Sequence, residues 1–197
     1  MKESALTTIH KSKNQNEIKD SWKYKILKAK HSPIRELTIS YKIDNIPRWI
    51  ADQLVRHNVG INSYMGTGRP DRNNKPRNEQ TMEELTCLMQ TVNGDSFINM
   101  CNQRMCIGCA SKETRELVEK IVLKIKEFDP AIAFFCVPNC ILYGACKEND
   151  FVDCGHYKRF IKTVLINHDY DVSKVVPMMM DIRLRYQSYH NFKNNLI

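Results

Sequence analysis

The stretch LTISYKIDNIPRWIADQLVRH, residues 37–57, decides the expected fold. Its first seven residues alternate between apolar and polar side chains, and a period of two predicts a strand with one buried face. Pro47 comes next, and proline is well tolerated in the first turn of a helix. Beyond it, Ile50 and Leu54 are four residues apart, so they share one face of a helix. The sequence therefore predicts a strand over 37–43 that leads into a helix.

Several segments outside this unit also have clear local patterns. Residues 59–77 are rich in Gly, Pro, Asn and Asp, which predicts a loop whose backbone can approach a ligand closely. Apolar spacing predicts a helix over 82–92 and an amphipathic helix over 96–105. Ser111 is a suitable N-cap for a strong helix, which Pro130 would stop. The apolar face of that helix is expected to comprise Leu117, Val118, Ile121, Val122, Ile125 and Phe128.

The two ends of the chain are less clearly patterned. Residues 1–22 are polar and lysine-rich and predict a loose arm or a short peripheral helix, and beyond residue 130 one further helix is expected near Phe160 and Val164. A strand, a helix, a glycine loop and several helices together predict an α+β (α/β-like) single domain, a mixed sheet with flanking helices. The expected segments are a polar arm at 1–27, a core at 28–130 and a cysteine-containing extension packed on it at 131–197.

The composition limits the kind of partner and the compartment. Thirty Lys and Arg against 22 Asp and Glu give a net charge of +8, which favours an anionic ligand. We find no apolar run near the ~20 residues that a membrane-spanning helix needs, and no signal peptide at Met1. We therefore expect a soluble, cytoplasmic protein without a membrane partner, whose eight cysteines are kept reduced.

The cysteines allow two interpretations. Cys106 and Cys109 have the two-residue spacing of a zinc knuckle, and other donors downstream could complete a tetrahedral site. Those donors are Cys136, Cys140, Cys146, Cys154 and His156. The alternative is free or buried thiols, which pack as small hydrophobic groups, and we expect this rather than a metal site because the second pair lacks the usual spacing.

Arginines gather in and beside the glycine-rich loop. Guanidinium groups bind phosphate through two parallel hydrogen bonds, and a neighbouring glycine, as in Gly68-Arg69, adds accessible backbone N–H groups. The alternative is that these arginines are solvated surface charges. His57, at the expected end of a helix, is either a helix-capping residue or a base or ligand-binding group. The arginines concerned are Arg56, Arg69, Arg72, Arg77 and Arg104.

Residues 56–69, RHNVGINSYMGTGR, resemble the signature of the flavin-dependent thymidylate synthases, Arg-His-Arg-x-x-Ser-x-Asn-Glu-x-Ser-x-Arg-Tyr, with one residue inserted before Arg69. Gln53 stands three residues before the motif, as in that family. The upstream segment 31–36, HSPIRE, resembles a family segment, and residues 91–104 carry Asn, Asn and Arg at the family's spacing. The similarity covers about residues 28–125 in one consistent order.

The resemblance implies an FAD enzyme and assigns a role to each matching residue. The expected FAD-binding residues are His31, Arg56, His57, Asn58, Asn93 and Asn99. The expected substrate-binding residues are Gln53, Gly68, Arg69, Arg77 and Arg104. Thr67 stands in the place of the motif serine, and Arg104 would face the pyrimidine carbonyl, so these two are the expected catalytic residues.

The resemblance also implies a reaction and an assembly. The reaction is the reductive methylation of dUMP to dTMP, in which methylenetetrahydrofolate gives the carbon, reduced FAD gives the hydride, and NADPH reduces the flavin. Family members are homotetramers with active sites between subunits. The expected partners are therefore a pyrimidine deoxynucleotide and further copies of the same chain.

Two alternative functions stay open, and the first follows from the differences between this sequence and the signature. The family's glutamate maps to Tyr64 or Met65 and its tyrosine to Pro70, and both changes lie on the substrate side. They favour, as a second hypothesis, FAD-dependent one-carbon modification of another pyrimidine deoxynucleotide such as dCMP. A third hypothesis, from another class, is a basic, zinc-stapled nucleic-acid-binding module, although no helix-turn-helix, zinc-finger or RNA-binding motif is recognisable.

Overall fold

The computed structural model describes residues 1–9, 19–148 and 153–194, and the chain is an α+β protein. By packing, it divides into two compact units, which we describe separately. Among the described residues, unit 1 comprises 1–9 and 31–100, and unit 2 comprises 19–30, 101–148 and 153–194. The three segments expected from the sequence at 1–27, 28–130 and 131–197 stay a prediction.

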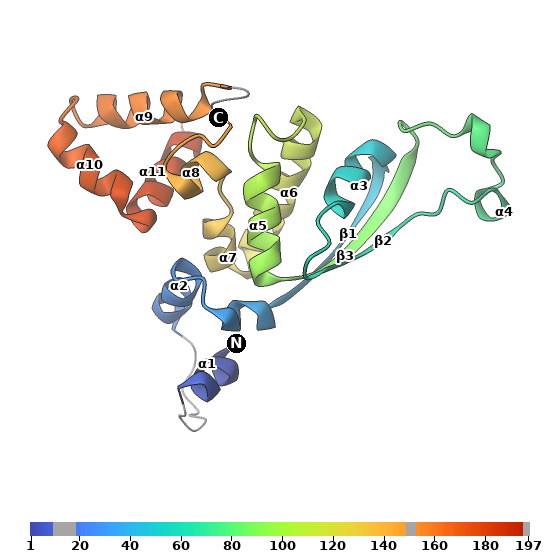
Figure 1. Cartoon of the computed structure of the whole chain (residues 1–197), viewed down its shortest axis with the longest axis horizontal. Helices are drawn as coiled ribbons and strands as arrows, with labels where there is room; N and C mark the ends of the chain where they lie inside the picture. Colours follow the sequence, from blue (N-terminus) through green and yellow to red (C-terminus); the bar gives the residue numbers. More distant parts are fainter. Residues whose placement is uncertain (10–18, 149–152, 195–197) are drawn as a thin grey trace. The chain divides into compact units, whose positions relative to one another are not determined.

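Unit 1 is built on a small sheet. Its strands are β1 (Thr38–Pro47), β2 (Ile61–Met65) and β3 (Leu85–Asn93), in the order β1-β3-β2, with β3 in the centre (Figure 1). β1 confirms the strand predicted over 37–43 and extends it. Both strand pairs are antiparallel, so the expectation of a mixed sheet was wrong for the part of the chain that the structure describes.

Two secondary-structure predictions in unit 1 were also wrong. β3 replaces the helix predicted over 82–92, and β2 lies inside the loop predicted over 59–77. The apolar residues of β3 happen to be spaced as on a helix. Its buried face also includes polar side chains, so the alternation of apolar and polar residues that predicts a strand is not visible in the sequence. That buried face comprises Thr86, Leu88, Gln90 and Val92.

Gln90 is fully buried in the central strand, and its neighbours explain how a polar side chain is accommodated there. Tyr41 on β1 and Ser63 on β2 lie directly opposite it in the register. The Tyr41 hydroxyl donates to Gln90 Oε1, and Gln90 Nε2 donates to Ser63 Oγ at 2.7 Å. Because a buried amide without partners is costly, this chain of hydrogen bonds fixes the strand register.

Helices α3 (Arg48–Val55) and α5 (Gly94–Arg104) flank the sheet of unit 1. α3 confirms the helix predicted after Pro47, and its Ile50 and Leu54 are buried as expected. α5 confirms the amphipathic helix predicted over 96–105. The Phe97 ring of α5 lies edge-on to Tyr41, so the start of this helix contacts the face of the sheet that carries Gln90.

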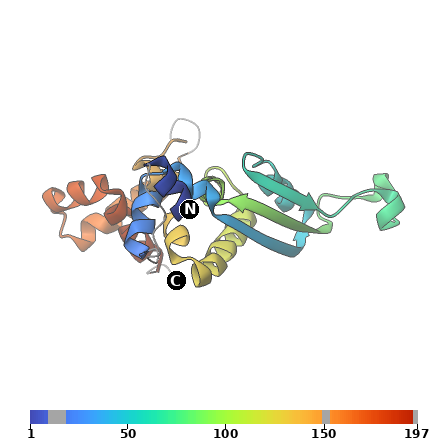
Figure 2. The same ribbon diagram turned by 90° about the horizontal axis from the view of Figure 1, so that it is seen from below.

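Shorter elements complete unit 1. The connection from β2 to β3 projects beyond the strand ends and carries a short helical turn at its tip (Figure 1 and Figure 2). The opposite face of the sheet exposes the cross-strand pair Tyr64 and Met89. The short elements are α1 (Lys2–Thr8), η1 (Ser32–Glu36), α4 (Pro70–Asn73) and η2 (Arg77–Glu79).

Unit 2 is helical in its described residues. The Ser111 hydroxyl accepts from Thr114 N at 3.2 Å, and Asp129 caps the next helix by accepting from Ile132 N at 3.1 Å. Both predicted boundaries of the strong helix are thereby confirmed. The helices are α2 (Asp20–Lys28), α6 (Lys112–Phe128), α7 (Pro130–Phe135), α8 (Asn139–Tyr143), α9 (His156–Asn167), α10 (Val172–Met180) and α11 (Ile182–Asn194).

Two expectations about unit 2 need correction. Phe128, expected on the apolar face of α6, is 84% exposed because it stands on the last turn of the helix. The tail was expected to hold one helix, and α9 confirms it, but α10 and α11 follow. None of the helices in the described part of the chain combines the length and apolar character needed to cross a bilayer.

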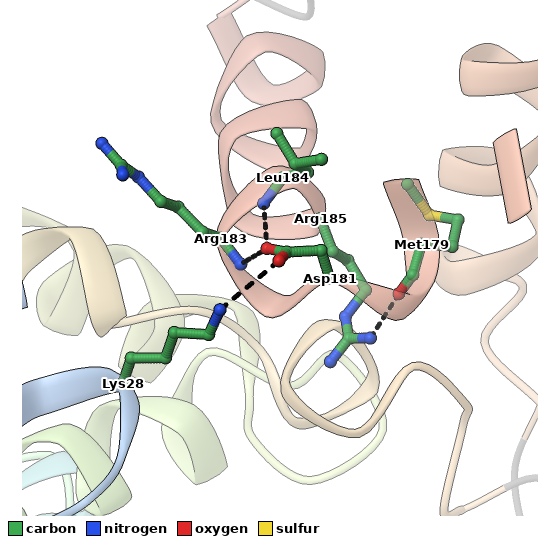
Figure 3. A network of polar contacts seen from close by, with 6 residues as sticks. All are labelled: Lys28, Met179, Asp181, Arg183, Leu184 and Arg185. Atoms are coloured by element: carbon green, nitrogen blue, oxygen red, sulfur yellow. Dashed lines mark hydrogen bonds and ion pairs between the residues drawn. The ribbon is translucent and has the colours of Figure 1, made fainter. Parts of the chain in front are cut away.

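A buried arginine ties three helices of unit 2 together. Arg185 Nε donates to Ile141 O and Nη2 to Leu142 O, both at 2.7 Å, near the end of α8. Its Nη1 donates to Met179 O in the last turn of α10 (Figure 3). The guanidinium thus satisfies carbonyls that the two helix ends leave unpaired, and it complements the negative ends of their dipoles.

Asp181 caps the start of α11, four residues before Arg185. Its Oδ1 accepts from the backbone N–H of Arg183 at 2.8 Å and of Leu184 at 3.2 Å, as a helix-capping side chain does (Figure 3). Its Oδ2 lies 3.4 Å from Lys28 Nζ of α2. These hydrogen bonds lower the pKa of the Asp181 carboxyl. The polar contacts at the junction between α10 and α11 therefore serve to stabilise the fold.

Candidate functional site

The first group of expected site residues lies at the end of α3. Arg56 is the C-cap of this helix and is exposed, His57 is half-buried, and Asn58 is exposed. Gly60 then turns the chain into β2 with φ of +69°, a left-handed conformation that glycine adopts without strain. Asn93 N, at the end of β3, donates to Gly60 O at 3.0 Å.

Gly60 packs closely against the start of α5. A Cβ atom at this position would lie 2.1 Å from Asn93 Nδ2 and 2.4 Å from Ser96 Oγ, which is closer than atoms approach in proteins. Asn93 Oδ1 in turn accepts from Ser96 N at 2.9 Å and caps α5. The structure thus brings Gly60, at the end of the segment 56–60, against Asn93 and Ser96, and residues 56–60 and 93–96 together form a small region of unit 1. We call this the corner; the sequence identified Asn93 but missed Gly60 and Ser96.

Other expected residues lie on elements that border the corner or continue from it. Gly94 N donates to Leu37 O at 2.8 Å, so the segment that begins with the exposed His31 runs past the same place. Asn99 is exposed on α5 and contacts Asp95, with 3.4 Å between Asn99 Nδ2 and Asp95 Oδ1. Two others are half-buried, namely Gln53 on α3 and Arg104 as the last residue of α5.

The second group of expected residues follows β2. Thr67 lies in the wall of an open cavity of about 490 Å³. Gly68 O accepts from Gln80 Nε2 at 2.8 Å, and Thr67 Oγ1 accepts from Arg69 N at 3.2 Å. Arg77 is exposed in η2. We call residues 66–84, which connect β2 to β3, the loop.

Two basic residues that the sequence did not single out share this cavity. Arg48 lines it from the start of α3, and its buried Nε has no hydrogen-bond partner among the described residues. Lys75 lines it from the loop and pairs with Glu84, whose pKa is lowered by that hydrogen bond. Arg48 reaches the cavity through strand pairing, since its N–H donates to Glu84 O at 2.9 Å. A guanidinium in the wall of an open cavity suits an anionic ligand.

Arg69 is engaged within the loop. Its Nε donates to Asp71 Oδ1 at 3.0 Å and its Nη2 to Asp71 Oδ2 at 2.8 Å, and both side chains are 58% exposed. An anion that binds Arg69 therefore competes with Asp71 for the same guanidinium donors. Because the pair is exposed, this competition is weak.

The two groups of residues stand at opposite ends of β2. The strand has five residues and advances by roughly 16 Å. Arg56 and Asn58 precede it, whereas Thr67 and Arg69 follow it. Within unit 1, the structure places expected residues in two separate groups, the corner and the loop, whereas Arg104 belongs to unit 2.

Unit 2 contains a second cavity, of about 220 Å³, whose wall includes four cysteines. All eight cysteines of the chain are free thiols. Burial, together with smaller contributions from neighbouring cysteines, raises the pKa of Cys140 to about 12. Those neighbours, Cys106, Cys146 and Cys154, line the same cavity.

The remaining thiols of unit 2 lie outside that wall. Cys109 contacts Cys106 and Glu148, and burial together with these contacts raises its pKa to about 12. Cys136 is buried against Cys101, whose pKa is raised by burial and by this neighbour. Within the described ranges, no three His, Cys, Asp or Glu side chains are gathered closely enough to hold a metal ion as they stand.

No protein-family model matches this chain, and a comparison with curated proteins finds no match either.

Proposed function

We propose that this protein is an FAD-dependent enzyme of the thymidylate synthase type, which methylates dUMP to dTMP with methylenetetrahydrofolate and NADPH. The close packing of Gly60 against Asn93 and Ser96 is the observation that carries the proposal. It joins two stretches of sequence that resemble separate parts of one family signature. The antiparallel pairing of β2 with β3 holds these two stretches next to each other.

The corner has the chemistry that a flavin dinucleotide requires. Arg56 and Asn58 are exposed there and supply hydrogen-bond donors, and a guanidinium matches the geometry of a phosphate. α5 begins at the same place, and the N-terminus of a helix attracts anions. His57, Asn93 and Asn99, together with His31, would complete the FAD contacts. Bound FAD would supply the hydride chemistry, and the protein would orient the reactants.

The loop has the chemistry for the nucleotide substrate. Arg69 and Arg77 are exposed cations, and Arg48 adds a guanidinium with an unused donor beside Thr67. Gly68 leaves the backbone accessible. We assign Gln53 of unit 1 and Arg104 of unit 2 to the pyrimidine from the family resemblance alone. A guanidinium stabilises the charge that develops on a carbonyl oxygen when hydride arrives.

The separation of the two groups supports an assembly with shared sites. A nucleotide cannot reach the flavin if one lies at the corner and the other at the loop of a single chain, roughly 16 Å apart along β2. We propose that the corner of one copy faces the loop of another within a homotetramer. Symmetric assemblies repeat such a contact in every subunit.

Optical spectroscopy tests the cofactor directly. We expect the purified protein, or the protein after addition of FAD, to show a bound-flavin absorption spectrum that survives gel filtration. Arg56→Ala should lose the bound flavin, whereas Arg72→Ala, at a similarly exposed arginine on α4, should retain it. A colourless protein that does not bind added FAD would contradict the proposal.

Product analysis tests the substrate. The protein is incubated with NADPH, methylenetetrahydrofolate and either dUMP or dCMP, and the product is identified by mass. A one-carbon gain on dUMP supports the proposed reaction. A gain on dCMP alone would move the function to the related deoxynucleotide, and no product with a flavin-loaded protein would rule out both.

A further inference from the structure

The cysteine-lined cavity of unit 2 collects donors from three separate segments of the chain. Cys106 follows α5, Cys140 lies on α8, and Cys146 and Cys154 belong to the connection between α8 and α9. All four line one cavity of about 220 Å³.

We propose that these four cysteines bind one zinc ion as a structural site. Zn²⁺ in structural sites is bound by four ligands in a tetrahedron, and four thiolates are one of its common ligand sets. As the structure stands, no three of the described donors surround a common point, so metal binding must draw the four sulfur atoms together. The proposal does not rest on the flavin-dependent function.

Cys140 is the centre of this set. Its thiol lines the cavity together with those of Cys106, Cys146 and Cys154. Cys136 is excluded because it packs against Cys101 and its Sγ contacts Ile132 O at 3.4 Å. The sequence pointed instead to Cys106 with Cys109, the pair with knuckle spacing.

His156 adds a second, independent observation. It lines the same cavity, and its Nε2 is buried without a hydrogen-bond partner among the described residues. Its ring packs against Tyr189 and Phe192, which holds it in place. An imidazole N–H beside a metal-bound thiolate has an acceptor, and such outer contacts orient the ligands of metal sites.

The position of the site predicts its role. Cys146 and Cys154 would tie the α8–α9 connection to α8 and to the segment that follows α5. The free energy of metal binding would then add to the stability of unit 2, because the unfolded chain has no preformed site. Loss of the metal should therefore loosen unit 2 and leave the sheet of unit 1 in place.

Metal analysis of the full-length protein tests the proposal. After purification with a thiol reductant, mass spectrometry of the elements should find about one zinc per chain. Cys146→Ser and Cys154→Ser should each lower this to below about a tenth. Cys87→Ser, a matched change in unit 1, should retain the metal. Circular dichroism verifies that each variant keeps its helices.

A cobalt titration keeps the test valid if the serine variants fail to fold. Wild-type protein stripped with a chelator should bind one equivalent of Co²⁺ and develop the visible absorption of tetrahedral cobalt thiolate. Absence of both zinc and this absorption would overturn the proposal. So would zinc that survives Cys140→Ser but is lost from Cys109→Ser, or an intact-mass spectrum showing a disulfide within the set.

Discussion

At the corner, Gly60 lies against Asn93 and Ser96 so closely that no side chain fits, and the backbone of β3 is hydrogen-bonded to it. At the loop, Arg69 is held by one exposed carboxylate, and the backbone projects from the sheet. The two ends of β2 thus differ in rigidity. A cofactor that stays bound benefits from a rigid site, whereas a substrate that enters and leaves requires an open one.

Glycine substitutions give the largest expected difference between the two ends. Gly60→Ala places a methyl group 2.1 Å from Asn93 Nδ2 in a left-handed backbone conformation, so we expect a loss of about 3 kcal/mol of unfolding free energy. Gly68→Ala meets the end of the Gln80 side chain at 2.8 Å and should cost less than about 1 kcal/mol. Urea denaturation measures both. Equal losses would show that the corner is no more rigid than the loop.

The sequence predicted those elements that have a clear local pattern and missed one that depends on long-range contacts. The elements whose apolar spacing matches their burial, β1 and α3, were predicted correctly. β3 was not, because Gln90 interrupts its alternation and is compensated only by Tyr41 and Ser63 on other strands. Long-range pairing of this kind leaves no local trace in the sequence.

In the candidate site, too, the residues that depend on long-range contacts could not be predicted from the sequence. The corner residues Arg56 and Asn93 were identified from a resemblance to a family motif, and the pairing of β2 with β3 places Gly60, four residues after Arg56, beside Asn93. Arg48 was missed because it reaches the cavity beside Thr67 only through its contact with Glu84 on a distant segment. Sequence spacing alone cannot indicate such a cavity.

Arginine substitutions at the two ends should affect different ligands. Arg56→Ala removes a donor at the corner and should weaken FAD binding by about 30-fold, which corresponds to a lost charge-assisted contact of about 2 kcal/mol. Arg69→Ala should leave FAD bound and raise the KM for dUMP by a similar factor. Flavin fluorescence and steady-state kinetics measure the two effects. If each variant weakens both ligands equally, the division between corner and loop is wrong.

Mixing the two weakened variants tests whether the corner and the loop of different copies form one site, at FAD and dUMP concentrations that saturate the wild-type protein but lie well below the weakened constants of the variants. Arg56→Ala and Arg69→Ala proteins are dissociated and reassembled together at equal concentrations. If each site takes its corner from one subunit and its loop from another, about a quarter of the sites in randomly mixed assemblies are intact. Activity should return to that fraction. Each variant reassembled alone is the control, and no recovery would place the whole site within a single chain.

The smallest expected effect concerns the Arg69–Asp71 pair. Asp71→Asn removes a carboxylate that competes with an anionic substrate for the Arg69 donors, yet both side chains are 58% exposed. Unfolding free energy should therefore change by less than about 0.5 kcal/mol, because exposed ion pairs contribute little. The KM for dUMP should fall by about two-fold, which corresponds to about 0.4 kcal/mol. The gain should disappear in the Arg69→Ala background. A KM that does not respond to Asp71→Asn would mean that Arg69 does not bind the phosphate, and the substrate anion would then have to be assigned to Arg48, whose buried Nε has no other use in the cavity.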